Sequence, residues 1–194
     1  MTEAIKTMKL YSQVERIHND LASVGIGRED PLSLDVLTRF DQLHYHGTDA
    51  VDEAIRRLDL GPADSVLDIG AGFGGPARYL GATSGARVTA VELQPDLDAT
   101  GADLTRRTGL DDRVTHICGD IHTVPLEPGS HTAAVSYLAL YHIPDRPRVF
   151  RRLSAALAGG GRIYIEDLYL RQPLNDYEAR MMREDLFGNT MAER

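Results

Sequence analysis

The segment Val66-Leu67-Asp68-Ile69-Gly70-Ala71-Gly72-Phe73-Gly74-Gly75 decides the fold, because an apolar run passes directly into a glycine-rich loop. The apolar part is typical of a buried strand. Glycines at alternate positions of the loop allow a tight turn and let backbone amides approach a ligand closely. Pro76 then suits the first turn of a helix. The segment therefore predicts a strand, loop and helix around a nucleotide-sized ligand.

Apolar runs of strand length alternate with helical segments from Ser65 onward, which predicts an α/β fold with a doubly wound, mostly parallel sheet. The predicted strands span residues 66–69, 87–92, 114–119, 133–137 and 162–165. The predicted helices between them span 77–83, 96–108 and 146–157, with glycine stops at Gly109 and at Gly159 to Gly161. A chain of 194 residues with 42% apolar content is best explained by one such domain with a short extension.

The extension occupies residues 1–60 and is predicted to be a helical lid, with the sheet domain at 61–194. Leu10, Val14, Ile17 and Leu21 recur at helical spacing, and a second helix is expected from Asp49 to Leu58. Between these helices lies a polar and aromatic run that contains His44, Tyr45 and His46.

The net charge of −8 and the isoelectric point near 5.3 disfavour nucleic acid and acidic membranes as partners and favour a small-molecule substrate. The single cysteine, Cys118, cannot form an internal disulfide and is expected at a buried strand position. No apolar stretch approaches membrane-spanning length, so we expect a cytoplasmic protein.

Three acidic residues at successive strand ends bear on the cofactor. Gly70-x-Gly72-x-x-Gly75 and the acid Glu92, about 20 positions further on, fit either a nicotinamide dinucleotide or S-adenosylmethionine. Asp68 favours the second, because a carboxylate there can orient a methionine ammonium. Asp120 can accept from an adenine amino group while Ile121 packs on the ring. The alternative for each acid is structural: a turn cap, a solvated strand end or an Asx turn.

With these acids in this order, the sequence resembles the class I S-adenosylmethionine-dependent methyltransferases from Ser65 to Asp167. The resemblance implies a Rossmann-like sheet with S-adenosylmethionine across the strand ends. It implies that the methionine portion lies on Gly70, Ala71 and Gly72, the ribose and adenine on Glu92 and Leu93, the adenine also on Asp120 and Ile121, and the methyl donor near Leu138. Two further strands that usually complete the family sheet are not evident after Leu170, where one helix with Tyr177 and Met181 is expected. An open sheet edge makes a homo-oligomer a possible assembly.

The segment Leu138 to Asp145 resembles that of the phosphoethanolamine and the glycine-betaine-forming (sarcosine/dimethylglycine) N-methyltransferases. This resemblance makes His142 the first catalytic candidate, paired with a tyrosine from the amino-terminal segment, Tyr45 or Tyr11. A histidine before a Pro-Asp turn is also widespread as a packing residue, and that interpretation stays open.

His44, His46 and Glu166, with Asp167 beside it, are candidate substrate-binding residues, and no second cluster at ligand spacing supports a metal site. The sequence thus favours S-adenosylmethionine-dependent methyl transfer to a small molecule, with an amine as the favoured acceptor and oxygen or carbon acceptors left open. Two alternatives are an NAD(P)-dependent oxidoreductase and a non-catalytic S-adenosylmethionine-binding module.

Overall fold

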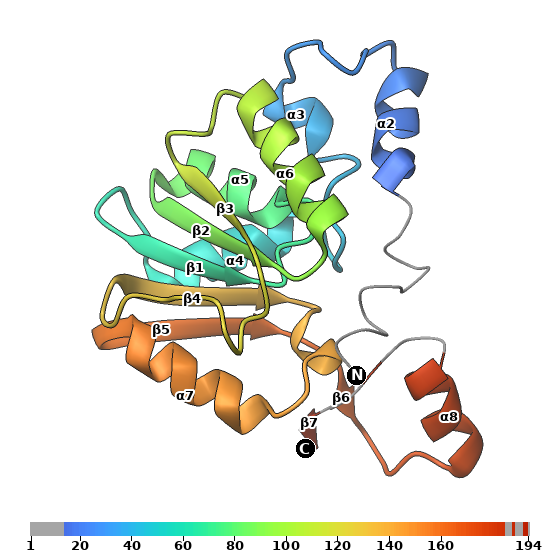
Figure 1. Cartoon of the computed structure of the whole chain (residues 1–194), viewed down its shortest axis with the longest axis vertical. Helices are drawn as coiled ribbons and strands as arrows, with labels where there is room; N and C mark the ends of the chain where they lie inside the picture. The colour runs from blue at the N-terminus through green and yellow to red at the C-terminus, as the bar shows by residue number, and fades with distance from the viewer. Residues whose placement is uncertain (1–13, 185–187, 189–191, 194) are drawn as a thin grey trace.

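The computed structural model describes residues 14–184, 188 and 192–193, and its centre is one sheet of five parallel strands (Figure 1). The strand order is β3-β2-β1-β4-β5, which confirms the predicted parallel α/β fold. Because the chain reverses its direction of winding between β1 and β4, their carboxyl ends form the crevice where such sheets bind ligands. The strands are β1 (Ser65–Ile69), β2 (Arg87–Glu92), β3 (Val114–Cys118), β4 (His131–Tyr137) and β5 (Leu157–Glu166).

Helices cover both faces of the sheet. Neighbouring residues of a strand point to opposite sides, and in β1 both sides are apolar, so each face needs a helical cover. Val66 of β1 packs in a cluster with α4 (Thr48–Leu58) and α5 (Gly75–Ser84). Leu67, the next residue, packs in a cluster with α7 (Arg146–Ala156) on the opposite face. The apolar run before the glycine loop therefore builds two cores at once.

The amino-terminal helices pack against a third apolar cluster rather than on the sheet itself. Ile17 and Leu21 of α2 (Val14–Ser23) and Leu37 of α3 (Leu34–Leu37) are buried with Leu97 and Leu104 of α6 (Pro95–Arg107). The Arg107 guanidinium also donates to the carbonyl oxygens of Gly27 and Asp30, at 2.7 and 2.9 Å. The predicted amino-terminal helix is confirmed from Val14, and Leu10 and Tyr11 lie outside the described residues.

Two details differ from the prediction. The glycines 159–161 lie inside β5 rather than between a helix and a strand, because α7 ends at Ala156 and β5 begins at Leu157. The pairing of β5 with β4 is irregular between His131 and Ala133. Cys118 is exposed rather than buried, since β3 is an edge strand in which Val114 is buried and the side chains that follow are partly buried or exposed.

After β5 the described chain forms β6 (Tyr169–Leu170), α8 (Asp176–Glu184) and β7 (Ala192–Glu193). Strands β6 and β7 pair with each other, so no strand in the described ranges continues the main sheet beyond β5. Helix α8 confirms the predicted carboxyl-terminal helix as far as Glu184. None of the described helices is long and apolar enough to cross a membrane.

Candidate active site

The glycine loop after β1 is held in place by its neighbours on both sides. The amides of Gly70 and Ala71 donate to the Val91 carbonyl oxygen of β2, at 2.9 and 3.1 Å. Gly70 has φ +71°, and a Cβ there would lie 2.3 Å from the Ala139 Cβ, after β4. Only glycine fits that position, so the loop backbone lies close to the β1–β4 crevice.

Asp68 is buried at the end of β1, and its Oδ2 atom has no hydrogen-bond partner among the described residues. Burial, and then the nearby Glu92 carboxylate, raise the pKa of Asp68 to about 7. A buried carboxylate oxygen without a partner costs free energy unless a cation or donor satisfies it. Asp68 therefore faces the crevice ready to bind a donor or a positive charge.

Glu92 and Asp120 already accept hydrogen bonds from their own loops. The Glu92 carboxylate accepts from the amides of Gly72 and Gln94, at 2.8 and 2.9 Å, and burial raises the pKa of Glu92 despite these bonds. Asp120 Oδ1 accepts from the His122 amide at 2.9 Å, which is the Asx turn left open as its alternative. Each carboxylate oxygen has a second lone pair, so both groups can still accept from a ligand.

One cavity unites the residues that the sequence assigns to the cofactor. It extends over the carboxyl ends of β1, β2 and β3 and past the end of β4. Each predicted cofactor residue lines it, together with two candidate histidines: Asp68, Gly70, Ala71, Gly72, Glu92, Leu93, Asp120, Ile121, Leu138, His44 and His142.

His142 ends a short 3-10 helix, η1 (Leu140–His142), that follows β4. Its ring is buried, and its centroid lies 3.8 Å from that of Tyr141. Leu138, just before η1, has the strained φ of +51°, and its amide donates to the Glu166 carbonyl oxygen at 2.8 Å. The turn after β4 is thus fixed to β5 and brings His142 to the cavity wall.

A second cavity adjoins the first, because Leu138 lines both. It brings together Tyr45, His46 and Glu166, whereas the alternative tyrosine, Tyr11, is not among the described residues. Acidic and aromatic side chains dominate its wall, and no lysine or arginine is among the described residues that line it. These residues are Tyr45, His46, Asp49, Ala50, Glu53, Leu138, Tyr164, Glu166, Asp167 and Leu168.

Not all of these carboxylates are available to a ligand. Glu53 pairs with Arg56 and Arg57, and Asp167 pairs with Arg146. Glu166 Oε1 accepts from the Tyr45 amide at 3.2 Å and lies 3.8 Å from His44 Nδ1. The segment between α3 and α4 is therefore bound to the end of β5, between the two cavities.

Sequence reasoning missed Tyr137, the last residue of β4. Its hydroxyl group is buried and has no partner among the described residues, and its ring lies 4.9 Å from the His44 ring. Burial, with Asp68, Tyr164 and Glu166 nearby, raises the pKa of Tyr137 above its usual range. A polar group at the end of the predicted strand was the available sequence signal, and Tyr137 was assigned to the strand rather than to the site.

Residues 67–165, half of the chain, match the family described as "Methyltransferase domain". The chain belongs to this methyltransferase family. The matched span runs from β1 to β5, so the glycine loop, the three acids and His142 all lie inside it.

Two curated methyltransferases show the same relationship in sequence. Methyltransferase GfsG of Streptomyces halstedii is 31% identical over 147 residues, which are 76% of this chain and 51% of that protein. Sarcosine/dimethylglycine N-methyltransferase of Halorhodospira halochloris is 29% identical over 170 residues, 85% of this chain and 59% of that protein. The chain thus spans little more than half the length of these relatives.

Among solved structures, the phosphoethanolamine N-methyltransferase 2 of Haemonchus contortus, in complex with S-adenosyl-L-methionine, matches with a TM-score of 0.70. It is 24% identical and covers 77% of this chain and 35% of that chain, so it bears on the fold alone. These comparisons confirm the resemblance to S-adenosylmethionine-dependent methyltransferases, among them N-methyltransferases named for small-molecule substrates.

Proposed function

We propose that this chain transfers a methyl group from S-adenosylmethionine to a small-molecule acceptor, and that the acceptor is an amine. S-adenosylmethionine as the methyl donor is supported by the buried Asp68 carboxylate beside the glycine loop, in a chain that belongs to a methyltransferase family. An unpartnered anion at a glycine-lined crevice suits the ammonium group of a methionine moiety.

The rest of the first cavity suits the adenosyl part of the cofactor. Glu92 would accept from the ribose hydroxyls and Asp120 from the adenine amino group, with Leu93 and Ile121 against the ring. Gly70, Ala71 and Gly72 would lie along the methionine portion, and Leu138 near the methyl donor. Leu138 lines both cavities, so this arrangement would direct the methyl group toward the second cavity.

The second cavity supports an amine acceptor. Tyr45 and Tyr164 offer aromatic faces and Glu166 a carboxylate, groups that attract amines and their cations. The name of the Halorhodospira halochloris relative, a sarcosine/dimethylglycine N-methyltransferase, points the same way. Residues 1–60 would act as a lid over donor and acceptor, and the contact of Tyr45 with Glu166 supports that role.

S-adenosylmethionine supplies an activated methyl group on sulfur, so this chain has chiefly to bring the acceptor nitrogen into line with it and exclude water. An amine attacks only in its unprotonated form, so a group that accepts its proton speeds the reaction. We assign this role to His142, at the wall of the first cavity, and assign Tyr45 to orienting the acceptor.

The substitution His142→Gln is expected to lower turnover by about 10²- to 10⁴-fold, the usual contribution of a general base. Affinity for S-adenosylhomocysteine should stay within about threefold, because this change spares the acids at the strand ends. Transfer of a labelled methyl group to sarcosine and dimethylglycine measures the first effect, and calorimetric titration the second.

The matched control is His131→Gln, since His131 is also buried but lies at the opposite end of β4, bonded to Ser130. Full turnover in His142→Gln would assign the proton transfer to another group. Cofactor binding without transfer to either amine in the unaltered chain would contradict the amine acceptor.

A further inference from the structure

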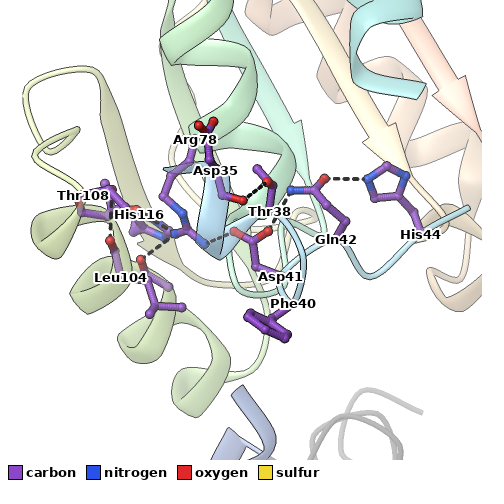
Figure 2. A network of polar contacts seen from close by, with 12 residues as sticks. Asp35, Thr38, Phe40, Asp41, Gln42, His44, Arg78, Leu104, Thr108 and His116 are labelled. Carbon is purple, nitrogen blue, oxygen red and sulfur yellow. Dashed lines mark hydrogen bonds and ion pairs between the residues drawn. The ribbon is translucent and has the colours of Figure 1, made fainter. Parts of the chain in front are cut away.

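A continuous network of polar contacts runs from the buried scaffold to His44, which lines the first cavity (Figure 2). It begins at Arg78 of α5, whose guanidinium donates to Asp41 Oδ2 at 3.0 Å, with both side chains fully buried. Arg78 also donates to the Gly101 carbonyl oxygen and the Thr105 hydroxyl of α6, at 3.0 and 2.9 Å. Helices α5 and α6 therefore hold the start of this network in place.

The charge on Arg78 fixes the state of Asp41. Burial raises the pKa of Asp41 overall and the adjacent guanidinium opposes that effect, while arginine keeps its proton in proteins. A buried guanidinium without a counter-charge is strongly unfavourable, so Asp41 remains the carboxylate partner. Its second oxygen, Oδ1, can consequently only accept a hydrogen bond.

Asp41 in turn sets the orientation of the Gln42 side-chain amide. Gln42 Nε2 donates to Asp41 Oδ1 at 2.9 Å, which turns Gln42 Oε1 toward His44 Nε2, also at 2.9 Å. Figure 2 shows these three side chains in line, with Gln42 in the middle. Because an amide oxygen only accepts, His44 Nε2 must carry a proton.

The other ring nitrogen of His44 also faces acceptors. His44 Nδ1 lies 2.9 Å from the Tyr45 carbonyl oxygen and 3.8 Å from Glu166 Oε1. The side chain is 1% exposed, so water does not replace either partner. Only a doubly protonated imidazole satisfies both sides.

The groups around His44 act on its protonation in opposite directions. Burial has the largest effect and lowers the pKa of His44 overall; the charge of the neighbouring His46 acts in the same direction, whereas Glu166 and the Tyr45 carbonyl oppose it. From β4, the Tyr137 ring lies 4.9 Å from the His44 ring at a tilt of 37°, and Asp68 is one of the charges that act on Tyr137. The Gln42 oxygen, fixed by Asp41, adds a further interaction that favours the proton.

We infer that Gln42 is a positioning residue that keeps the His44 imidazole doubly protonated, so that a fixed positive charge lies against Glu166 at the boundary of the two cavities. The benefit for catalysis rests on the proposed function. A lone carboxylate would stabilise the protonated amine, which does not attack. A carboxylate paired with the charged His44 still accepts a hydrogen bond from the amine but stabilises its protonated form less. His44 would thus act through Glu166 without touching the methyl group.

The test is nuclear magnetic resonance of ¹⁵N-labelled histidine in the full chain and in Gln42→Met, which keeps length and volume but loses both hydrogen bonds. We expect His44 to show two protonated nitrogens at pH 6.5, where an unperturbed histidine is about half titrated. In Gln42→Met its titration midpoint should fall by about one pH unit, the equivalent of one hydrogen bond to a charged group. His44→Asn assigns the signal.

Two comparisons make the result decisive. The midpoint of His131, which is bonded to Ser130 and lies outside this network, should not move. In Gln42→Glu, a carboxylic acid that donates its proton to Asp41 Oδ1 still offers its other oxygen to His44 Nε2, so the His44 midpoint should return toward its original value. A singly protonated His44 at pH 6.5 in the unaltered chain, or an equal midpoint in Gln42→Met, would overturn the inference.

A second measurement tests the consequence for Glu166. The acidic limb of the pH profile for methyl transfer to dimethylglycine should move to higher pH in Gln42→Met, with unchanged affinity for S-adenosylhomocysteine. An unmoved limb would refute the link to the acceptor. Should the unaltered chain transfer no methyl group while His44 titrates as expected, the proposed function fails and the protonation of His44 stands.

Discussion

The substitution Asp41→Leu is expected to lower the free energy of unfolding by about 3–5 kcal/mol, because it leaves the Arg78 guanidinium buried without a counter-charge. Both side chains are fully buried, so water cannot replace the lost carboxylate. The loss is large because Arg78 also joins α5 to α6 through Gly101 and Thr105. Urea-induced unfolding, followed by circular dichroism, measures the change.

Two controls separate the buried pair from ordinary surface charge. Asp20→Ala removes an exposed i,i+4 partner of Arg16 and should change stability by less than about 1 kcal/mol. The double variant Asp41→Leu, Arg78→Met should recover part of the loss, because it removes both charges together. A loss below about 1 kcal/mol in Asp41→Leu would mean that the pair does not hold the fold.

Replacement of Asp68 by asparagine is expected to weaken S-adenosylmethionine and S-adenosylhomocysteine binding by about 30-fold or more, since truncating a buried charge pair costs about 2–5 kcal/mol. The shape of the side chain is kept, so the loss reports the charge. At pH 8 the ligand-free variant should be more stable than the unaltered chain, because the folded-state pKa of Asp68 is raised to about 7. The stability linked to its proton is lost as pH rises through that value.

The same shift predicts how cofactor binding depends on pH. The ammonium group binds the ionised Asp68, so affinity should rise between about pH 5.5 and 7.5 in the unaltered chain and lose most of that slope in Asp68→Asn. Isothermal titration at several pH values measures both. Asp64→Asn is the matched control: Asp64 precedes the opposite end of β1, accepts from Thr132 and Gly61, and should leave cofactor affinity unchanged. Equal affinity in Asp68→Asn would remove Asp68 from the site.

Local patterns in the sequence predicted the parallel sheet and the cofactor cavity. Alternating apolar runs specify strands and helices, and the glycine loop with Asp68 and Glu92 specifies which strand ends meet, because parallel strands end at one edge. The nine predicted cofactor residues line one cavity for that reason. Their roles in binding remain predictions.

The remaining features depend on contacts between distant segments, which no local pattern encodes. Arg78 and Asp41 lie 37 positions apart, and each alone reads as a surface charge. His44 and Glu166 are 122 positions apart, and they meet because the segment after α3 packs against the end of β5. Glycines 159–161 were predicted as a helix stop, but they lie inside β5, at the irregularity between Leu157, opposite His131, and Arg162, opposite Ala133.

The measurement that tests the central claim most directly is isothermal titration of the purified chain with S-adenosylmethionine, S-adenosylhomocysteine and NAD in parallel. We expect saturable binding of the two adenosyl compounds, with Kd values of about 1–100 μM, and no heat with NAD. Binding of NAD alone would contradict the claim and favour an oxidoreductase, and no binding of either adenosyl compound would contradict it as well.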